Sequence, residues 1–169
     1  MTGLQWLGPG LAIVAATLLC APPWGAAGDL KFVQPLLPYV VIHLTTERRG
    51  DAVPDWLVFL AGFTTEVAGQ GPLGYWSLIY LSGYTMVRST TAARPLRAAS
   101  GAAFFALTLV CLMLMQWSAA SIYYLRPVAI MPLIGAAAVA FFVYMVLAMA
   151  IPRSAKEPAR INDRLQRGI

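Results

Sequence analysis

The sequence predicts an all-α integral membrane protein, folded as one bundle of six transmembrane helices in which the second and third spans are short. The chain has 169 residues, of which 59% are hydrophobic and only 11% are charged, a composition that excludes an ordinary soluble domain. Six apolar runs follow one another, and spans of about 20 residues each use most of this length. We therefore expect residues 1–151 to form a single bundle and residues 152–169 to form a basic cytoplasmic tail.

The first apolar run covers residues 4–21 and is closed by two prolines. Trp6 and Trp24 bracket it, as aromatic anchors at the membrane interface do. Residues 1–28 contain no Lys or Arg, whereas a secretory signal peptide begins with a basic region. We therefore expect an uncleaved first span.

The second and third runs, residues 32–46 and 53–67, are too short for ordinary spans. Fifteen helical residues reach only about 22 Å at a rise of ~1.5 Å each, less than the ~30 Å hydrocarbon core. Pro35 also kinks or delays the second helix. Two interpretations stay open: thin, tilted spans in a thinned bilayer, or a re-entrant pair buried against the other helices.

The last three runs are easier to assign. The fourth covers residues 72–88, and the fifth covers residues 98–125 without a charged side chain. The sixth, residues 128–151, is rich in Gly and Ala, the small residues that let helices pack closely in membranes. These three runs complete the expected set of six spans.

The basic residues predict the orientation of the bundle. With six crossings, ten Lys and Arg residues fall in one set of connectors and tail, and two fall in the other. The larger set comprises Arg48, Arg49, Arg88, Arg94, Arg97, Arg153, Lys156, Arg160, Arg164 and Arg167, and the smaller set comprises Lys31 and Arg126. Because cytoplasmic loops carry the excess of basic residues, both termini should be cytoplasmic.

The apolar segment from Trp56 to Gly74 contains one carboxylate, Glu66. Placing a charged side chain at the centre of a bilayer costs at least ~2.5 kcal/mol, so such a residue points to function or to a packed interior. We expect Glu66 to be buried and to accept hydrogen bonds from a neighbouring helix end or from a partner's span, with Gly62 and Gly69 allowing close approach. The alternative is that Glu66 lies near the headgroups and is hydrated.

Other chemistry is sparse. The only histidine, His43, is interpreted as an interfacial or buried hydrogen-bonding residue, and Cys20 and Cys111 as core residues. No catalytic pair, metal-ligand cluster or cofactor motif is present, so we expect no enzyme activity, no metal, no cofactor and no nucleic-acid partner. Binding of a cation or polar solute by Glu66 beside Thr64 and Thr65 stays open as an alternative.

The segment from Pro35 to Gly74 resembles the MreD family, the small rod shape-determining membrane proteins of bacteria. The family pattern has a proline opening the second span, a short basic and proline-containing loop, then a phenylalanine, a glycine, an acidic residue four places on and a small-residue turn closing with Leu-Gly. The matching residues are Pro35, Arg48 or Arg49, Pro54, Phe59, Gly62, Glu66, Gly69, Leu73 and Gly74, with Pro72 in the turn. The acidic residue is usually aspartate in the family.

The resemblance implies a non-enzymatic scaffold of the machinery that builds the lateral cell wall. It implies a location in the bacterial cytoplasmic membrane, a bitopic MreC-type partner, and through that partner the RodA glycosyltransferase, its penicillin-binding transpeptidase and MreB filaments. The implied fold is similar to the substrate-binding S-components of energy-coupling-factor transporters, so a small-molecule-binding transporter subunit is the alternative.

The basic residues of the cytoplasmic face allow two interpretations. Arg48, Arg49, Arg94 and Arg97 are candidates for binding a filament or anionic lipid. Orientation of the chain in the membrane already accounts for their position.

Overall fold

The computed structural model describes residues 7–20, 33–49, 53–69, 72–93 and 98–151, and the side chains in these ranges except those of residue 49 and residues 92–100. The predicted basic tail, residues 152–169, lies outside the described residues. So do Lys31, Arg94 and Arg97.

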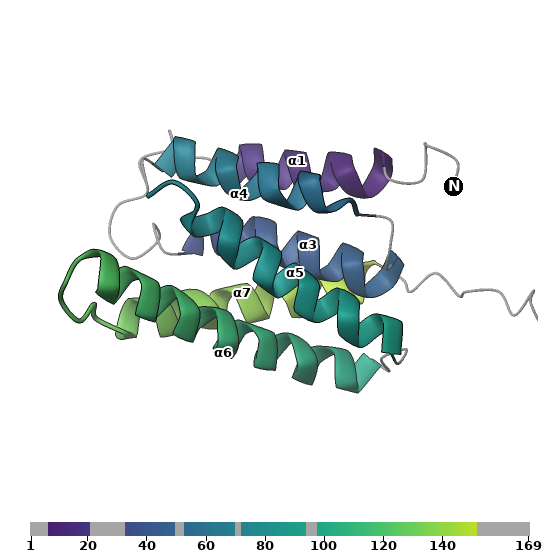
Figure 1. The fold of residues 1–169 in the computed structure, drawn as a ribbon. Coiled ribbons are helices and arrows are strands. Elements are labelled where there is room, and N and C mark those ends of the chain that lie inside the picture. The colour runs from purple at the N-terminus through teal and green to yellow at the C-terminus, as the bar shows by residue number, and fades with distance from the viewer. Residues whose placement is uncertain (1–6, 21–32, 50–52, 70–71, 94–97, 152–169) are drawn as a thin grey trace, which may run out of the picture.

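The described residues form six helices and no strand (Figure 1). The helices are α1 (Leu7–Cys20), α3 (Leu36–Arg49), α4 (Asp55–Gly69), α5 (Tyr75–Ala93), α6 (Ala98–Tyr123) and α7 (Met131–Ala150). Each helix falls on one of the six apolar runs of the sequence, so the all-helical class is confirmed. As expected, α3 and α4 are short, with 14 and 15 residues.

The helices alternate in direction and pack in three layers of two (Figure 1). The middle layer consists of α3 and α5, which contact each other. On one side α1 packs on α3 and α4 packs on α5, and on the other side α7 packs on α3 and α6 packs on α5. The two middle helices therefore carry the buried centre of the molecule.

Local sequence explains where the helices around the α4–α5 turn begin and end. Pro54 precedes α4, and the N–H of Leu57 donates to its carbonyl in the first turn of the helix. At the other end, Gly74 has a φ of 90°, a left-handed conformation that glycine adopts without steric cost. The fourth apolar run, which forms α5, therefore becomes helical at Tyr75 rather than at Pro72, where the sequence predicted its beginning.

The core is unusually aromatic. Tyr39, Tyr80, Tyr84, Phe105 and Tyr144 are all buried. Phe105 stacks on Tyr144 with ring centroids 4.1 Å apart, and Tyr39 lies between Tyr80 and Phe105. Aromatic pairs of this kind add to the stabilisation that burial provides. Because the rings come from α3, α5, α6 and α7, the aromatic core joins these four helices.

Two helices are long and apolar enough to cross a membrane, Gly101–Tyr123 within α6 and Met131–Ala150. Only 28% and 22% of their most apolar segments are buried inside the molecule. The core helix of a soluble protein is mostly buried, whereas these helices expose large apolar side chains. The exposed side chains include Leu107, Val110, Leu114, Ile134, Val139, Phe142, Val146 and Met149.

Candidate functional site

Glu66, the acidic residue of the apolar segment, lies inside the hairpin formed by α4 and α5. Its side chain is 1% exposed. One carboxylate oxygen, Oε2, accepts the N–H of Gly74 at 2.8 Å, and the other, Oε1, accepts the N–H of Ser77 at 2.7 Å. This is the buried arrangement at a helix end that the sequence suggested, rather than a hydrated position.

The two donors belong to the start of α5. The first N–H groups of a helix have no partner within the helix. Gly74 occupies the capping position just before α5, and Ser77 is the third residue of the helix. A carboxylate there satisfies two such donors at once and lies at the positive end of the helix dipole. Glu66 therefore acts as an N-terminal cap that α4 supplies to α5.

Gly62 lies one helical turn before Glu66 and permits this contact. A Cβ atom added at Gly62 would lie 2.5 Å from the Cα of Ser77 and 2.6 Å from its nitrogen. The backbones of α4 and α5 thus touch at this point, as expected for a small residue between membrane helices. At Gly69, in contrast, an added Cβ would meet no described atom within 4 Å, so the close approach expected there is not made within the described part of the chain.

The turn between the helices contributes backbone rather than side chains. The carbonyl of Pro72 accepts the N–H of Tyr75 at 3.3 Å, and Gly74 supplies the left-handed residue and one donor to Glu66. Leu73 points outward and is 77% exposed. Glu66, Gly62, Pro72 and Gly74 are therefore parts of one structural unit.

Pro35 is connected to this unit through a tyrosine that sequence reasoning missed. The hydroxyl of Tyr80 donates to the carbonyl of Pro35 and lies 3.4 Å from the hydroxyl of Thr65. Tyr80 is fully buried. Its spacing from Glu66 carries no motif, so only the packing of α3, α4 and α5 reveals its role.

Phe59 lies apart from Glu66. Its ring is 45% exposed and stacks on Phe63, with centroids 6.3 Å apart. The two rings form part of an apolar stripe on the outer side of α4, which also includes Trp56, Leu60 and Val67. The structure therefore divides the predicted site residues into an internal set around Glu66 and an outward-facing set.

Arg48, predicted to lie on a basic cytoplasmic face, holds the end of α7. Its guanidinium Nη2 donates to the carbonyl of Ala148 at 2.9 Å, and Nη1 donates to the carbonyl of Ile151. The neighbouring Glu47 accepts the hydroxyl of Tyr144 at 2.7 Å. The last carbonyls of a helix need such donors, so Arg48 has a structural role whether or not it also contacts other molecules.

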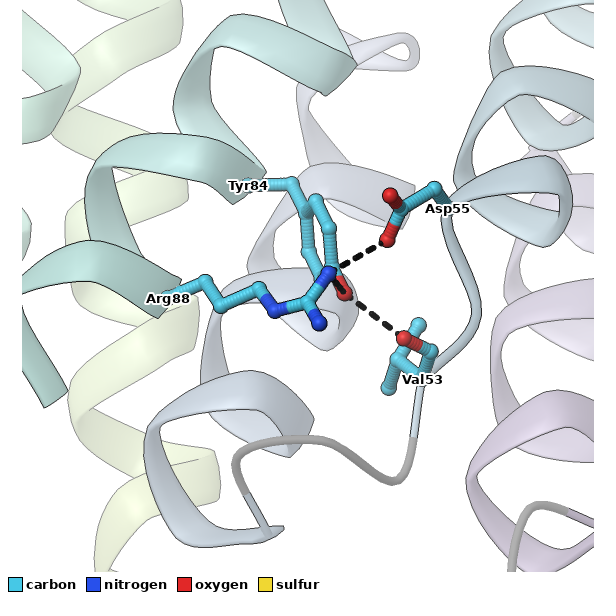
Figure 2. Close-up of polar contacts among 4 residues, drawn as sticks. All are labelled: Val53, Asp55, Tyr84 and Arg88. Carbon is cyan, nitrogen blue, oxygen red and sulfur yellow. Dashed lines mark hydrogen bonds and ion pairs between the residues drawn. The ribbon is translucent and has the colours of Figure 1, made fainter. Parts of the chain in front are cut away.

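A second set of polar contacts joins the start of α4 to the end of α5 (Figure 2). Arg88 Nη1 lies 2.7 Å from Oδ1 of Asp55, and the hydroxyl of Tyr84 donates to the carbonyl of Val53 at 2.7 Å. The Arg88 guanidinium also donates to the Tyr84 hydroxyl at 3.4 Å. The α4–α5 hairpin is therefore held at both ends, by Glu66 at one and by these contacts at the other.

His43 is buried in the aromatic core. Nδ1 lies 3.3 Å from the hydroxyl of Tyr39, while Nε2 has no hydrogen-bond partner within the described part of the chain. The ring meets Phe105 and Tyr144 edge to face, at centroid distances of 4.6 and 5.7 Å. The side chain is fully buried, so the buried interpretation of His43 is the one that the structure shows.

A groove of about 440 Å³ runs between α1 and α4. Its lining is apolar apart from the indole N–H of Trp56 and the hydroxyls of Thr17 and Thr64, and both hydroxyls donate to carbonyls of their own helices. A site for a polar solute needs convergent polar groups to orient it. The groove offers none among the described residues, and Glu66 does not line it.

Metal chemistry finds no support in the part of the chain that the structure covers. No group of three or more His, Cys, Asp or Glu side chains is close enough there to hold an ion, and Cys20 and Cys111 are free thiols.

Compared with protein-family models, curated proteins and solved structures, the chain gives no significant match. The resemblance to the MreD family therefore depends on its motif residues alone.

Proposed function

We propose that this chain is a six-span membrane protein that acts as a non-enzymatic scaffold of the MreD type. In this proposal it resides in the bacterial cytoplasmic membrane and binds an MreC-type bitopic protein. It is connected through that partner to the RodA glycosyltransferase, a penicillin-binding transpeptidase and, indirectly, MreB filaments.

The apolar outer surface supports integration in a bilayer. On α1, α4 and α7 alike, exposed positions carry leucine, phenylalanine and other large apolar side chains, among them Leu11, Leu18, Leu60, Phe63 and Phe142. A water-soluble monomer rarely exposes so much contiguous apolar surface. Lipid tails, in contrast, are a suitable solvent for it.

The distribution of charge supports a cytoplasmic location for both termini. Glu47, Arg48, Asp55 and Arg88 all lie near one end of the bundle, where α3 and α5 end and α4 begins (Figure 1). We call this the charged end. The start of α1 and the end of α7 lie at this end too. The alternating helices therefore support the cytoplasmic orientation that was assigned from the basic residues.

The observation that carries the scaffold proposal is the set of hydrogen bonds that the Glu66 carboxylate accepts. In a transport or catalytic site, an intramembrane carboxylate faces a cavity or a reacting group. Here both oxygens of Glu66 accept backbone N–H groups of α5. Four of the residues that resemble the MreD family thus hold the α4–α5 hairpin together, namely Gly62, Glu66, Pro72 and Gly74. Such an internally braced hairpin suits a protein that offers surfaces to partners.

A complementation experiment tests the proposal. The chain is produced in a rod-shaped bacterium that lacks its own MreD protein, together with an MreC-type protein from the organism that the chain comes from. We expect restored rod shape and recovery of the partner with the chain in mild detergent. Spherical cells with normal amounts of both proteins in the membrane, and no recovered partner, would contradict it.

The transporter-subunit alternative has one observation in its favour, the apolar groove between α1 and α4. Native mass spectrometry of the purified chain separates the two proposals. A tightly held small molecule other than phospholipid would favour the transporter subunit, and its absence favours the scaffold.

A further inference from the structure

The α4 helix is short, has two well-defined ends and lies at the surface of the bundle. It begins at Asp55, whose carboxylate pairs with Arg88 at the charged end, and it ends at Gly69 before the turn containing Leu73 and Gly74. With 15 residues, it is about 22 Å long at ~1.5 Å per residue. The hydrocarbon core of an average bilayer is ~30 Å thick.

The helices on the opposite side of the bundle are longer. α7 has 20 residues and α6 has 26, which correspond to about 30 Å and about 39 Å. Both α4 and α6 start near the charged end, although α5 runs on past Arg88, the partner of Asp55, before α6 begins. Part of the difference in length therefore appears at the other end. There α6 extends well past the α4–α5 turn (Figure 1).

From this difference in helix length we propose that the bilayer is locally thinned beside α4. The thinned leaflet is the one that faces the α4–α5 turn. The proposal rests on the proposed function, because it requires the bundle to span a membrane. The surface concerned is the outward stripe of α4, namely Trp56, Phe59, Leu60, Phe63 and Val67. The partner that fits it is a lipid layer thinner than average.

Two other ways of relieving the mismatch do not apply to α4. Tilting makes a helix span less of the bilayer, so it relieves only a helix that is too long. Burial within the chain's own bundle does not apply either, since Trp56, Leu60 and Val67 are 53%, 46% and 58% exposed. Thinning of the bilayer costs only fractions of a kcal/mol per Å of mismatch.

The Glu66 cap fits this placement. If water reached the whole turn freely, it could satisfy the first N–H groups of α5. Those of Gly74 and Ser77 are instead bound by a buried carboxylate of the same chain. Unsatisfied backbone donors at the edge of a hydrocarbon layer are costly, so an internal cap is what a turn at that depth needs.

Spin labels at three exposed positions test the proposal. Leu73→Cys reports the α4–α5 turn, Leu125→Cys reports the α6–α7 turn and Phe142→Cys reports the middle of α7. These residues are 77%, 92% and 69% exposed, so labels there leave the core unchanged. Each is made in the full-length chain carrying Cys20→Ala and Cys111→Ala. The chains are reconstituted in phosphatidylcholine vesicles with dimyristoleoyl, dioleoyl or dierucoyl tails, which differ in thickness.

Collisions of each label with a water-soluble nickel chelate and with oxygen measure its depth. We expect the ratio of nickel to oxygen collisions at residue 73 to stay close to that at residue 125, and well above that at residue 142, in all three lipids. A residue 73 label that loses its nickel collisions in dioleoyl vesicles while keeping oxygen collisions would overturn the proposal, because the turn would then be submerged in an unthinned bilayer.

Two further outcomes separate the proposal from its premises. A label at residue 73 that is shielded from both reagents would show that another protein copy covers the turn, which also overturns thinning. Free access of nickel to residue 142 would show that α7 is not embedded, and this result would contradict the membrane assignment itself. The Phe142→Cys control therefore distinguishes failure of the further inference from failure of the proposed function.

Discussion

At the scale of single residues, Glu66 offers the sharpest test of the structure. Glu66→Gln keeps the shape of the side chain but replaces one acceptor oxygen by an NH₂ group, which faces a backbone donor of Gly74 or Ser77. Leaving a buried donor unsatisfied costs about 1–3 kcal/mol. We expect a loss of that size in the free energy of unfolding, measured by denaturant titration in mild detergent.

Asp55→Asn is the matched control for this prediction. It makes the same chemical change on the same helix, but the Asp55 side chain is 66% exposed and its ion pair with Arg88 lies at the surface. Exposed ion pairs contribute about 0–1 kcal/mol. Equal effects of the two substitutions would show that Glu66 is not the buried cap described here.

Two glycines of the same helix form a second matched pair. Gly62→Ala places a methyl group 2.5 Å from the Cα of Ser77, so α4 and α5 have to separate. Such overpacking costs about 1–3 kcal/mol, part of which is offset by the better helix propensity of alanine. Gly69→Ala meets no described atom within 4 Å, and we expect it to be neutral or slightly stabilising.

Thermal unfolding of the three proteins in one detergent measures this difference. The expected order of stability places the Gly62→Ala protein below both the parent and the Gly69→Ala protein. If Gly62→Ala unfolds at the parent's temperature, the two backbones do not touch as described.

At the scale of helices, Arg48 ties α3 to the end of α7. Removing its guanidinium by Arg48→Ala leaves the carbonyls of Ala148 and Ile151 without these donors. We expect the last turn of α7 to fray, seen as faster hydrogen exchange of the amides of residues 147–151 while the middle of α7 keeps its protection. Arg88→Ala is the control, since Arg88 pairs with Asp55 of α4 and donates to Tyr84 of its own helix.

The positions of the helices could be predicted from sequence, whereas their contacts could not. Each apolar run between charges, prolines or glycines became a helix, because those residues end helices through local geometry. The start of α5 was displaced to Tyr75 by the left-handed Gly74. Which helices pack together depends on contacts between distant residues, for example Tyr80 with Pro35, and these leave no periodic signal.

The candidate site was predictable to the same extent. A lone carboxylate in an apolar run indicated burial and hydrogen bonding, and Glu66 is buried and bonded. Its donors are backbone N–H groups, which every residue except proline has, so the side chain of Ser77 gave no signal. The basic character of Arg48 suggested the surface, but the carbonyls it binds belong to a helix about a hundred residues later.

At the scale of the whole molecule, the three layers explain why short helices are tolerated. The middle layer of α3 and α5 is covered on both sides, and its buried tyrosines find partners inside the protein, as Tyr84 does with the carbonyl of Val53. The outer layers carry most of the exposed large apolar side chains. The longer α6 and α7 match or exceed the ~30 Å hydrocarbon thickness, so in the proposed membrane bundle they are the anchors and the opposite outer layer is the thinner one.

The alternating helices also make a prediction about sidedness. Asp55 and Leu125 are exposed at opposite ends of the bundle, and the charged end should face the cytoplasm because it carries the excess of Lys and Arg. In intact spheroplasts, a membrane-impermeant maleimide should therefore label Leu125→Cys but not Asp55→Cys, and opening the membrane should make Asp55→Cys reactive. Phe142→Cys should stay unreactive in both, because a thiol within the hydrocarbon layer stays protonated and thus poorly nucleophilic. Labelling of Asp55→Cys from outside would mean that the bundle is inverted, and labelling of both ends from outside would mean that it does not span the membrane.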